Sequence, residues 1–144
     1  MKIRQLENAQ YAGRRFTARY QTNGYYEITA AEGGFRIAYT PFEAPAARSF
    51  DDVMFDKAAR GQGIGSMLMA RIKEAARASG ARMLVLETQS CNEAAIAFYR
   101  KNGFSVIGFD LYAYSNADPE RCEVRIEMGK KLQDAVPKEE FRNA

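Results

Sequence analysis

The chain has 144 residues, of which 47% are hydrophobic and 27% are charged, and its formal net charge is +3. These values fit one globular domain with a single core, and such a small positive excess is not typical of a nucleic-acid binder. The sequence contains no histidine, which excludes His-based catalytic triads, histidine metal ligands and a histidine general base. Two cysteines, Cys91 and Cys122, form neither a CxxC pair nor a disulfide framework.

The ends of the chain give the expected domain boundaries and location. Residues 1–7 are not followed by an apolar signal region, and no apolar run is long enough to span a bilayer. We therefore expect a cytoplasmic protein with reduced thiols, no metal, and neither a membrane nor a nucleic-acid partner. Residues 1–132 are expected to form a single domain, and residues 133–144 a polar tail.

The first half of the chain has short periodic segments separated by turn formers. Its expected elements are a strand over residues 3–6, a helix capped by Asn8 that runs through Tyr20, strands over residues 25–29 and 35–39 on either side of Gly33-Gly34, and an irregular stretch from Pro41 to about Phe50.

The middle of the chain reads as strand, helix, strand. Val53-Met54-Phe55 is a very short apolar strand, and a helical repeat of apolar residues begins at Ile64 and ends before Gly80. The continuous apolar run over residues 83–86 suits a strand covered on both faces, as in a parallel sheet. This order predicts a right-handed βαβ unit.

A second helix and two strands complete the chain. The helix is expected after Ser90-Cys91-Asn92-Glu93, which has the S-x-x-E form of a capping box, and Asn102-Gly103 should end it. Residues 104–114 read as a long strand, and residues 121–129 alternate apolar and polar side chains. With turn formers over residues 115–120 between them, the two segments should pair as an antiparallel hairpin.

The feature with the clearest chemistry is the sequence Arg60-Gly61-Gln62-Gly63-Ile64-Gly65 between a strand and a helix. A helix N-terminus offers free N–H groups and a partial positive charge, glycines allow close approach of an anion, and Arg60 can add a charged contact. The loop lacks the Lys-Ser/Thr ending of a nucleotide P-loop and the G-x-G-x-x-G of a dinucleotide fold. Alone it is a weak signal, because many strand-to-helix turns need glycine.

Three segments in order raise the significance of this loop: the loop itself, the helix start at Asn92, and residues 98–104 with their Gly103-Phe104 pair. Together they resemble the GNAT N-acetyltransferase superfamily. The resemblance implies an α/β fold with a GNAT-type mixed sheet, a central βαβ unit, and acetyl-CoA as co-substrate. It implies that Tyr99 protonates the leaving thiolate. The implied cofactor contacts are Met54, Phe55, Arg60, Gly61, Gln62, Gly63, Ile64, Gly65, Ser66, Asn92, Ala95, Phe98 and Tyr99.

Residues 86–92, 95–99 and 108–112 are similar to the streptothricin acetyltransferase branch of that superfamily. Members usually have a meander of antiparallel strands before the glycine loop, and the last of these strands lines the acetyl group. Here the N-terminal meander is shortened. Residues 25–29 and 35–39 could substitute for it, or a second copy of the chain could complete the sheet as a homodimer. The third alternative is an internally shortened form with weakened catalysis.

Several candidate site residues also have a purely structural interpretation. Tyr99 could be a core aromatic residue, and Asn92 a simple helix cap. Glu87 could orient a substrate amine or act as a base through water, or it could be a salt-bridged carboxylate at a strand end. Cys91 is a plain loop thiol rather than a nucleophile, because no histidine is present to activate it. Asp110, Glu123 and Glu127 could meet a cationic substrate.

The resemblance therefore predicts transfer of acetyl from acetyl-CoA to a primary amine of a small molecule or protein, by direct attack in a ternary complex. The predicted catalytic residues are Tyr99 and Glu87. The alternative is a catalytically weak acyl-CoA-binding or protein-interaction module of the same fold, since the wall expected to face the acetyl group is shortened.

Overall fold

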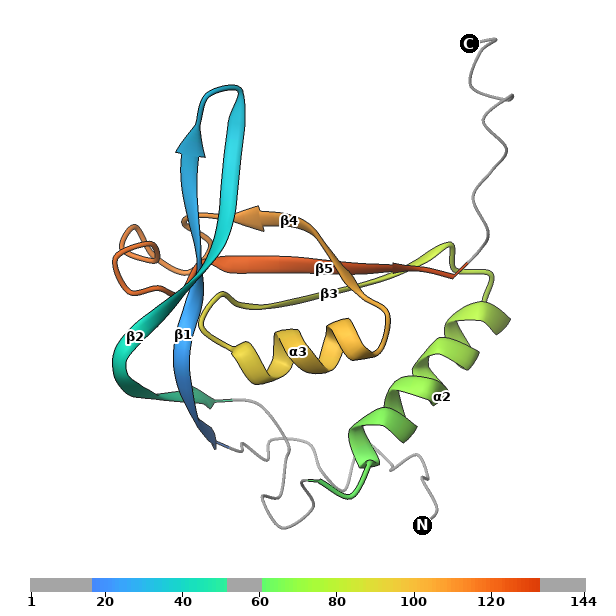
Figure 1. Cartoon of the computed structure of the whole chain (residues 1–144). Coiled ribbons are helices and arrows are strands. Elements are labelled where there is room, and N and C mark those ends of the chain that lie inside the picture. Colours follow the sequence, from blue (N-terminus) through green and yellow to red (C-terminus); the bar gives the residue numbers. More distant parts are fainter. Residues whose placement is uncertain (1–16, 52–60, 133–144) are drawn as a thin grey trace, which may run out of the picture.

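A computed structural model describes residues 17–51 and 61–132. They form two antiparallel sheets and two helices (Figure 1). Strands β1 (Thr17–Ala31) and β2 (Gly34–Asp51) make a long hairpin, and the three-stranded sheet has the order β3-β5-β4. The remaining elements are α2 (Ile64–Ala78), β3 (Met83–Gln89), α3 (Glu93–Lys101), β4 (Ser105–Asp110) and β5 (Arg125–Lys131).

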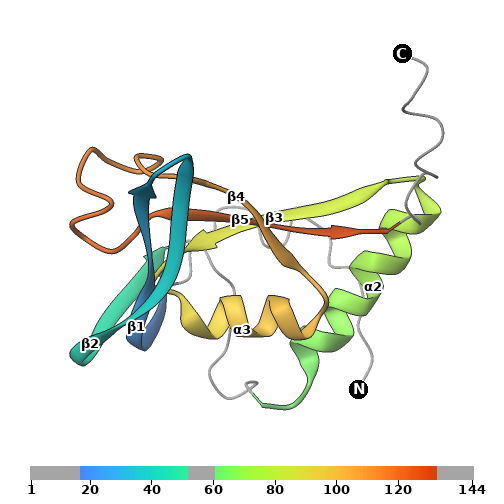
Figure 2. The same cartoon turned by 45° about the horizontal axis from the view of Figure 1, so that its top comes forward.

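Both helices lie on the same side of the three-stranded sheet (Figure 2). The buried core between them consists of Met69 from α2, Ile96 from α3, Phe104, and Ile126 and Met128 from β5. The period-two alternation of the last strand points its apolar side chains into this core, as the sequence predicted. Within the described residues, neither helix has the length and hydropathy needed to cross a lipid bilayer.

The hairpin of β1 and β2 is more extensive than expected. The strands expected over residues 25–29 and 35–39 are confirmed, and the turn at Gly33 joins them. The prediction of a helix running through Tyr20 is wrong for residues 17–20, which belong to strand β1. The irregular stretch expected from Pro41 to about Phe50 is confirmed only for residues 42–45, which have no partner in the ladder, because β2 continues to Asp51. Pro45 is tolerated because it lies in the stretch of residues 42–45 that has no partner in the ladder, where a missing N–H costs no ladder hydrogen bond.

The C-terminal antiparallel pair is confirmed, with Ser105 opposite Gly129 and Asp110 opposite Arg125. The first strand of that pair is shorter than the predicted residues 104–114, because β4 ends at Asp110. There the Tyr112 N–H donates to the Asp110 carboxylate at 3.0 Å, and the Tyr114 N–H donates to Asp118 at 2.8 Å. These bonds turn the backbone away from the ladder and form a loop.

The predicted βαβ unit is described only from its helix onward. The short strand over residues 53–55 lies outside the described residues. The second strand, β3, pairs antiparallel with β5, which has inserted beside it. Val85 is 58% exposed, so the expectation that this strand is covered on both faces is wrong within the described part of the chain. Gly80 and Gly103 follow the two helices, as predicted.

Candidate active site

The glycine loop leads into α2 as the sequence predicted. Gly61 and Gly63 both have φ of 77°, in the left-handed region that favours glycine. Among residues 17–51 and 61–132, a Cβ atom added at either glycine would meet nothing within 4 Å, so this part of the chain leaves the space beside the loop open. Gly63 is the N-cap residue of α2, where no side chain forms a capping hydrogen bond, and the first turn contains no acidic residue. The Met67 N–H donates to the Gly63 carbonyl at 3.0 Å, a hydrogen bond of the first helical turn.

These observations fit a bound pyrophosphate. The N–H groups of the first helical turn have no partner within the helix, and the partial positive charge at that end favours an anion. Since no carboxylate in the first turn opposes an anion, residues 61–66 can hold a phosphate by backbone contacts. Arg60, Met54 and Phe55, which were also predicted to contact the cofactor, lie outside the described residues.

The third glycine of the loop has a different role. A Cβ atom on Gly65 would come within 3.2 Å of the Phe98 ring, so a larger residue there would push α3 away from α2. Phe98 in turn packs edge-on against Tyr99, with ring centroids 5.6 Å apart. This close approach places Phe98, one of the predicted cofactor contacts, beside the loop, with Tyr99 packed against it.

Asn92 is the N-terminal cap of α3, and its side-chain oxygen accepts a hydrogen bond from the Ala95 N–H at 3.2 Å. The expected capping box is therefore wrong, because Ser90 does not start the helix. Ser90 is fully buried and donates its hydroxyl to the Cys122 carbonyl at 2.8 Å. The predicted cofactor residues Asn92 and Ala95 thus form one hydrogen-bonded turn at the start of α3.

Tyr99 lies half-buried on α3 and packs against the core cluster and the Phe104 ring. Burial raises the pKa of its hydroxyl above the ordinary value of 10.0. The hydroxyl has no hydrogen-bond partner among residues 17–51 and 61–132. It therefore keeps its proton at neutral pH, as a general acid requires.

Glu87 lies apart from Tyr99. Its neighbours Leu84 and Leu86 pack on the core, and alternation along β3 turns Glu87 to the opposite face of the sheet. The side chain is 57% exposed and forms an ion pair with Arg125 at 3.5 Å. The structure therefore does not bring the two predicted catalytic residues together, and it gives Glu87 the salt bridge that was its structural alternative.

Arg125 organises a cluster of carboxylates that the sequence did not reveal. Its guanidinium contacts Glu87 of β3, Asp110 of β4 at 3.3 Å and Glu127 of its own strand at 3.4 Å. Asp110 and Glu127, predicted to meet a cationic substrate, therefore share the exposed face of the sheet with Glu87. Glu123 lies elsewhere and pairs with Arg48 of β2 at 3.5 Å. No sequence signal marked Arg125, because alternating charges on a strand usually form only a solvated face.

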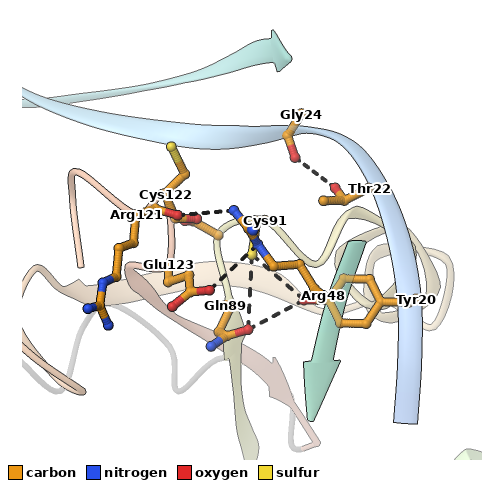
Figure 3. A network of polar contacts seen from close by, with 10 residues as sticks. Tyr20, Thr22, Gly24, Arg48, Gln89, Cys91, Arg121, Cys122 and Glu123 are labelled. Atoms are coloured by element: carbon orange, nitrogen blue, oxygen red, sulfur yellow. Dashed lines mark hydrogen bonds and ion pairs between the residues drawn. The ribbon is translucent and has the colours of Figure 1, made fainter. Parts of the chain in front are cut away.

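Figure 3 shows a second polar network, where the hairpin meets the end of β3 and the loop before β5. The Tyr20 hydroxyl lies 3.4 Å from the Gln89 side-chain oxygen and 3.7 Å from the sulfur of the fully buried Cys91. Burial is the largest cause that raises the pKa of Tyr20. Cys122 has φ of 59°, and burial raises the pKa of its thiol. Both cysteines are free thiols.

Known proteins match this sequence and geometry. Residues 6–104 match the profile of the acetyltransferase (GNAT) family. The chain belongs to that family. The prediction from sequence is therefore confirmed at the level of family and fold.

Two solved structures share the fold of this GNAT chain. A nourseothricin acetyltransferase aligns with a TM-score of 0.68 and 23% identity over 83% of this chain and 98% of that one. A Bacillus anthracis protein assigned as a streptothricin acetyltransferase, solved in complex with acetyl coenzyme A, aligns with a TM-score of 0.64 and 20% identity over 85% and 99%. At these identities the likeness establishes the fold.

Two curated relatives match smaller parts of their own sequences. An uncharacterised protein of Mycobacterium leprae is 35% identical over 97 residues, which make up 66% of this chain and 24% of the relative. An IAA acetyltransferase of Azospirillum brasilense is 49% identical over 47 residues, which make up 33% of this chain and 31% of the relative. The chain thus spans about a quarter to a third of the length of these relatives.

Proposed function

We propose that the protein is an N-acetyltransferase that moves acetyl from acetyl-CoA to a primary amine of a small molecule or a protein. The observation that carries the proposal is the open, uncapped glycine loop at the start of α2, in a chain of the GNAT family. The amides of residues 61–66 would hold the pyrophosphate, with Phe98 of α3 beside them, and Asn92 and Ala95 would contact the cofactor at the start of the same helix. A GNAT-fold structure solved with acetyl coenzyme A supports the choice of co-substrate.

Acetyl-CoA supplies an activated thioester, whose sulfur must gain a proton as the amine is acylated. Tyr99 is the proposed donor, because burial keeps its hydroxyl protonated at neutral pH. The amine must lose a proton before it attacks. Water or a carboxylate takes it, and Glu87 is the proposed carboxylate, acting across the exposed face of the sheet through water. Its ion pair with Arg125 at 3.5 Å holds this carboxylate on the exposed face.

A second candidate is an acyl-CoA-binding module without turnover. The observation that favours it is the placement of Glu87 on the sheet face opposite Tyr99, since acid and base must both reach one reacting centre.

Calorimetry with acetyl-CoA and a thiol-release assay over a panel of primary amines separate the two candidates. Binding with thiol release that depends on an amine supports the transferase. Binding without release supports the module, and absence of binding would contradict both. The Tyr99→Phe variant is the catalytic control and should lose thiol release. The Glu74→Gln variant, changed on the exposed surface, is the neutral control and should keep both binding and thiol release.

The proposal includes two further expectations from the sequence. The enzyme is placed in the cytoplasm, where acetyl-CoA and free thiols such as Cys91 coexist. A homodimer could complete the sheet, because within the described residues β3 pairs on one edge only, with β5. Light scattering on the purified chain tests the dimer, and a monomer at working concentration would contradict it.

A further inference from the structure

Helix α3 lies between two different neighbours. On one side it meets α2, through the contact between Phe98 and Gly65 and through the Lys73 ammonium, which donates to the Asn102 carbonyl at 2.7 Å. On another side it meets the hairpin of β1 and β2 (Figure 1). The cofactor loop and the hairpin therefore flank the same helix.

The hairpin is attached to α3 at two points, Glu93 and Arg100. These residues are seven positions apart, so they share one face of the helix about 10 Å from each other. Each holds one tyrosine hydroxyl: Tyr39 donates to Glu93, and Arg100 donates to Tyr26 at 2.8 Å. Tyr26 and Tyr39 are directly opposite each other in the hairpin ladder, with ring centroids 5.6 Å apart. The Arg100 guanidinium also lies 4.9 Å from the centre of the Tyr26 ring.

The Glu93 attachment is the more elaborate of the two. Besides Tyr39, its carboxylate accepts the Asn23 N–H at 2.7 Å and lies 3.2 Å from the hydroxyl of the buried Thr22. These contacts fall at the one irregularity in the hairpin register, between Thr22 and Gly24. Burial alone would raise the pKa of Glu93, but the hydrogen bonds it accepts outweigh burial and lower it. A carboxylate thus fixes β1, at the point where four residues of β2 stand opposite Asn23 alone, to the first turn of α3.

Gly24 makes this attachment sterically possible. A Cβ atom there would approach the Tyr39 hydroxyl to 2.6 Å and the Thr40 carbonyl oxygen to 2.4 Å. A larger residue would therefore displace the tyrosine that reaches Glu93.

In a ternary complex the amine must approach from a side that acetyl-CoA does not fill, and across α3 from the glycine loop that side is bounded by the hairpin. We infer that Glu93 is a positioning residue: it holds the hairpin against the first turn of α3 and thereby sets the place of the acceptor amine. This inference rests on the proposed function. Glu93 itself touches neither reacting group.

The test uses the full chain with Glu93→Gln, Tyr39→Phe and the double variant, and Glu74→Gln as a matched control on the exposed face of α2. Glutamine has one acceptor oxygen in place of two, so Thr22 and Asn23 of β1 lose part of their support. We expect amide exchange at Asn23 and Gly24 to become about tenfold faster. The acceptor KM should rise by about five- to tenfold, while kcat and the acetyl-CoA Kd stay within about twofold.

Tyr39→Phe removes a single hydroxyl from an exposed side chain, so it should fold normally and give a smaller rise in KM. The double variant should be less than additive, because both changes break the same contact. Glu74→Gln should leave all four quantities unchanged.

Two outcomes would overturn the inference while leaving the proposed function intact: unchanged exchange and KM in Glu93→Gln, or an acetyl-CoA Kd and melting temperature that worsen in step with KM. If the wild-type chain acetylates no amine, the proposed function and the acceptor role of Glu93 both fail. The exchange measurement still decides in that case whether Glu93 holds the hairpin.

Discussion

Gly63 combines a left-handed backbone with open space at the start of α2. A substitution there has two separable effects, backbone strain of about 1–2 kcal/mol and obstruction of an approaching anion. We predict that Gly63→Val raises the acetyl-CoA Kd at least about tenfold and also lowers the melting temperature. Gly63→Asn is the control, since asparagine tolerates this conformation. It should keep stability and still weaken binding, and normal binding by both variants would contradict the phosphate site.

Tyr99 offers a test of the proposed acid. We predict that Tyr99→Phe lowers turnover by about a hundredfold while the acetyl-CoA Kd stays near that of the wild type. Because burial raises the Tyr99 pKa above 10.0, any fall in wild-type turnover caused by ionisation of this hydroxyl should have its midpoint above pH 10. The measurement is kcat against pH for both proteins. Equal turnover across the range would rule out the acid assignment.

At the scale of elements, α3 depends on Asn92 for its start. We predict that Asn92→Ala lowers the free energy of unfolding by about 1 kcal/mol, because the Ala95 N–H loses its partner. Asn92→Ser can still cap the helix and should recover most of that stability, as urea denaturation would show. It removes the amide group predicted to touch the cofactor, so it should still weaken acetyl-CoA binding. Unchanged binding would mean that Asn92 acts only as a cap.

The elements that the sequence predicted correctly have a strong local signal. The amphipathic repeat and Gly80 define α2, and the alternation of Ile126 and Met128 defines β5. The errors arose where distant contacts decide. Pro41 usually indicates the end of a strand, but here it interrupts only the pairing, which resumes at Ala46. Glu93 fits the pattern of a capping box, but its partners, 54 to 71 residues away, are in the hairpin.

In the candidate site, too, the residues fixed by local sequence could be predicted and those fixed by distant contacts could not. The glycine loop and the helix start at Asn92 could be predicted because both depend on neighbours in sequence. The position of Glu87 relative to Tyr99 could not, because residues 83–86 are apolar on both faces of β3, and the packing of Leu84 and Leu86 on the core decides which face is buried. Arg125 was missed for a related reason, since its three carboxylates come from three strands.

At the scale of the whole molecule, the attachment of the hairpin to α3 should depend on pH. The Glu93 pKa is lowered below its ordinary value of 4.5, so the stabilisation it provides is fully present above pH 4.5 and is lost as the pH falls through the lower folded-state value. We predict that the wild-type free energy of unfolding decreases below pH 4.5 and that Glu93→Gln shows a shallower decrease. Urea denaturation at a series of pH values measures both slopes, and parallel curves would contradict the prediction.

The prolines of β2 affect how the protein behaves when many copies are crowded together. Pro41 and Pro45 lie in the second strand of an exposed two-stranded hairpin, and neither residue has an N–H to offer to a neighbouring molecule. A strand of another molecule that paired with this edge of the sheet would find no N–H donor at either proline. Fibril growth by addition of strands to this edge is therefore disfavoured. Pro41 and Pro45 therefore make edge-to-edge association through β2 less favourable.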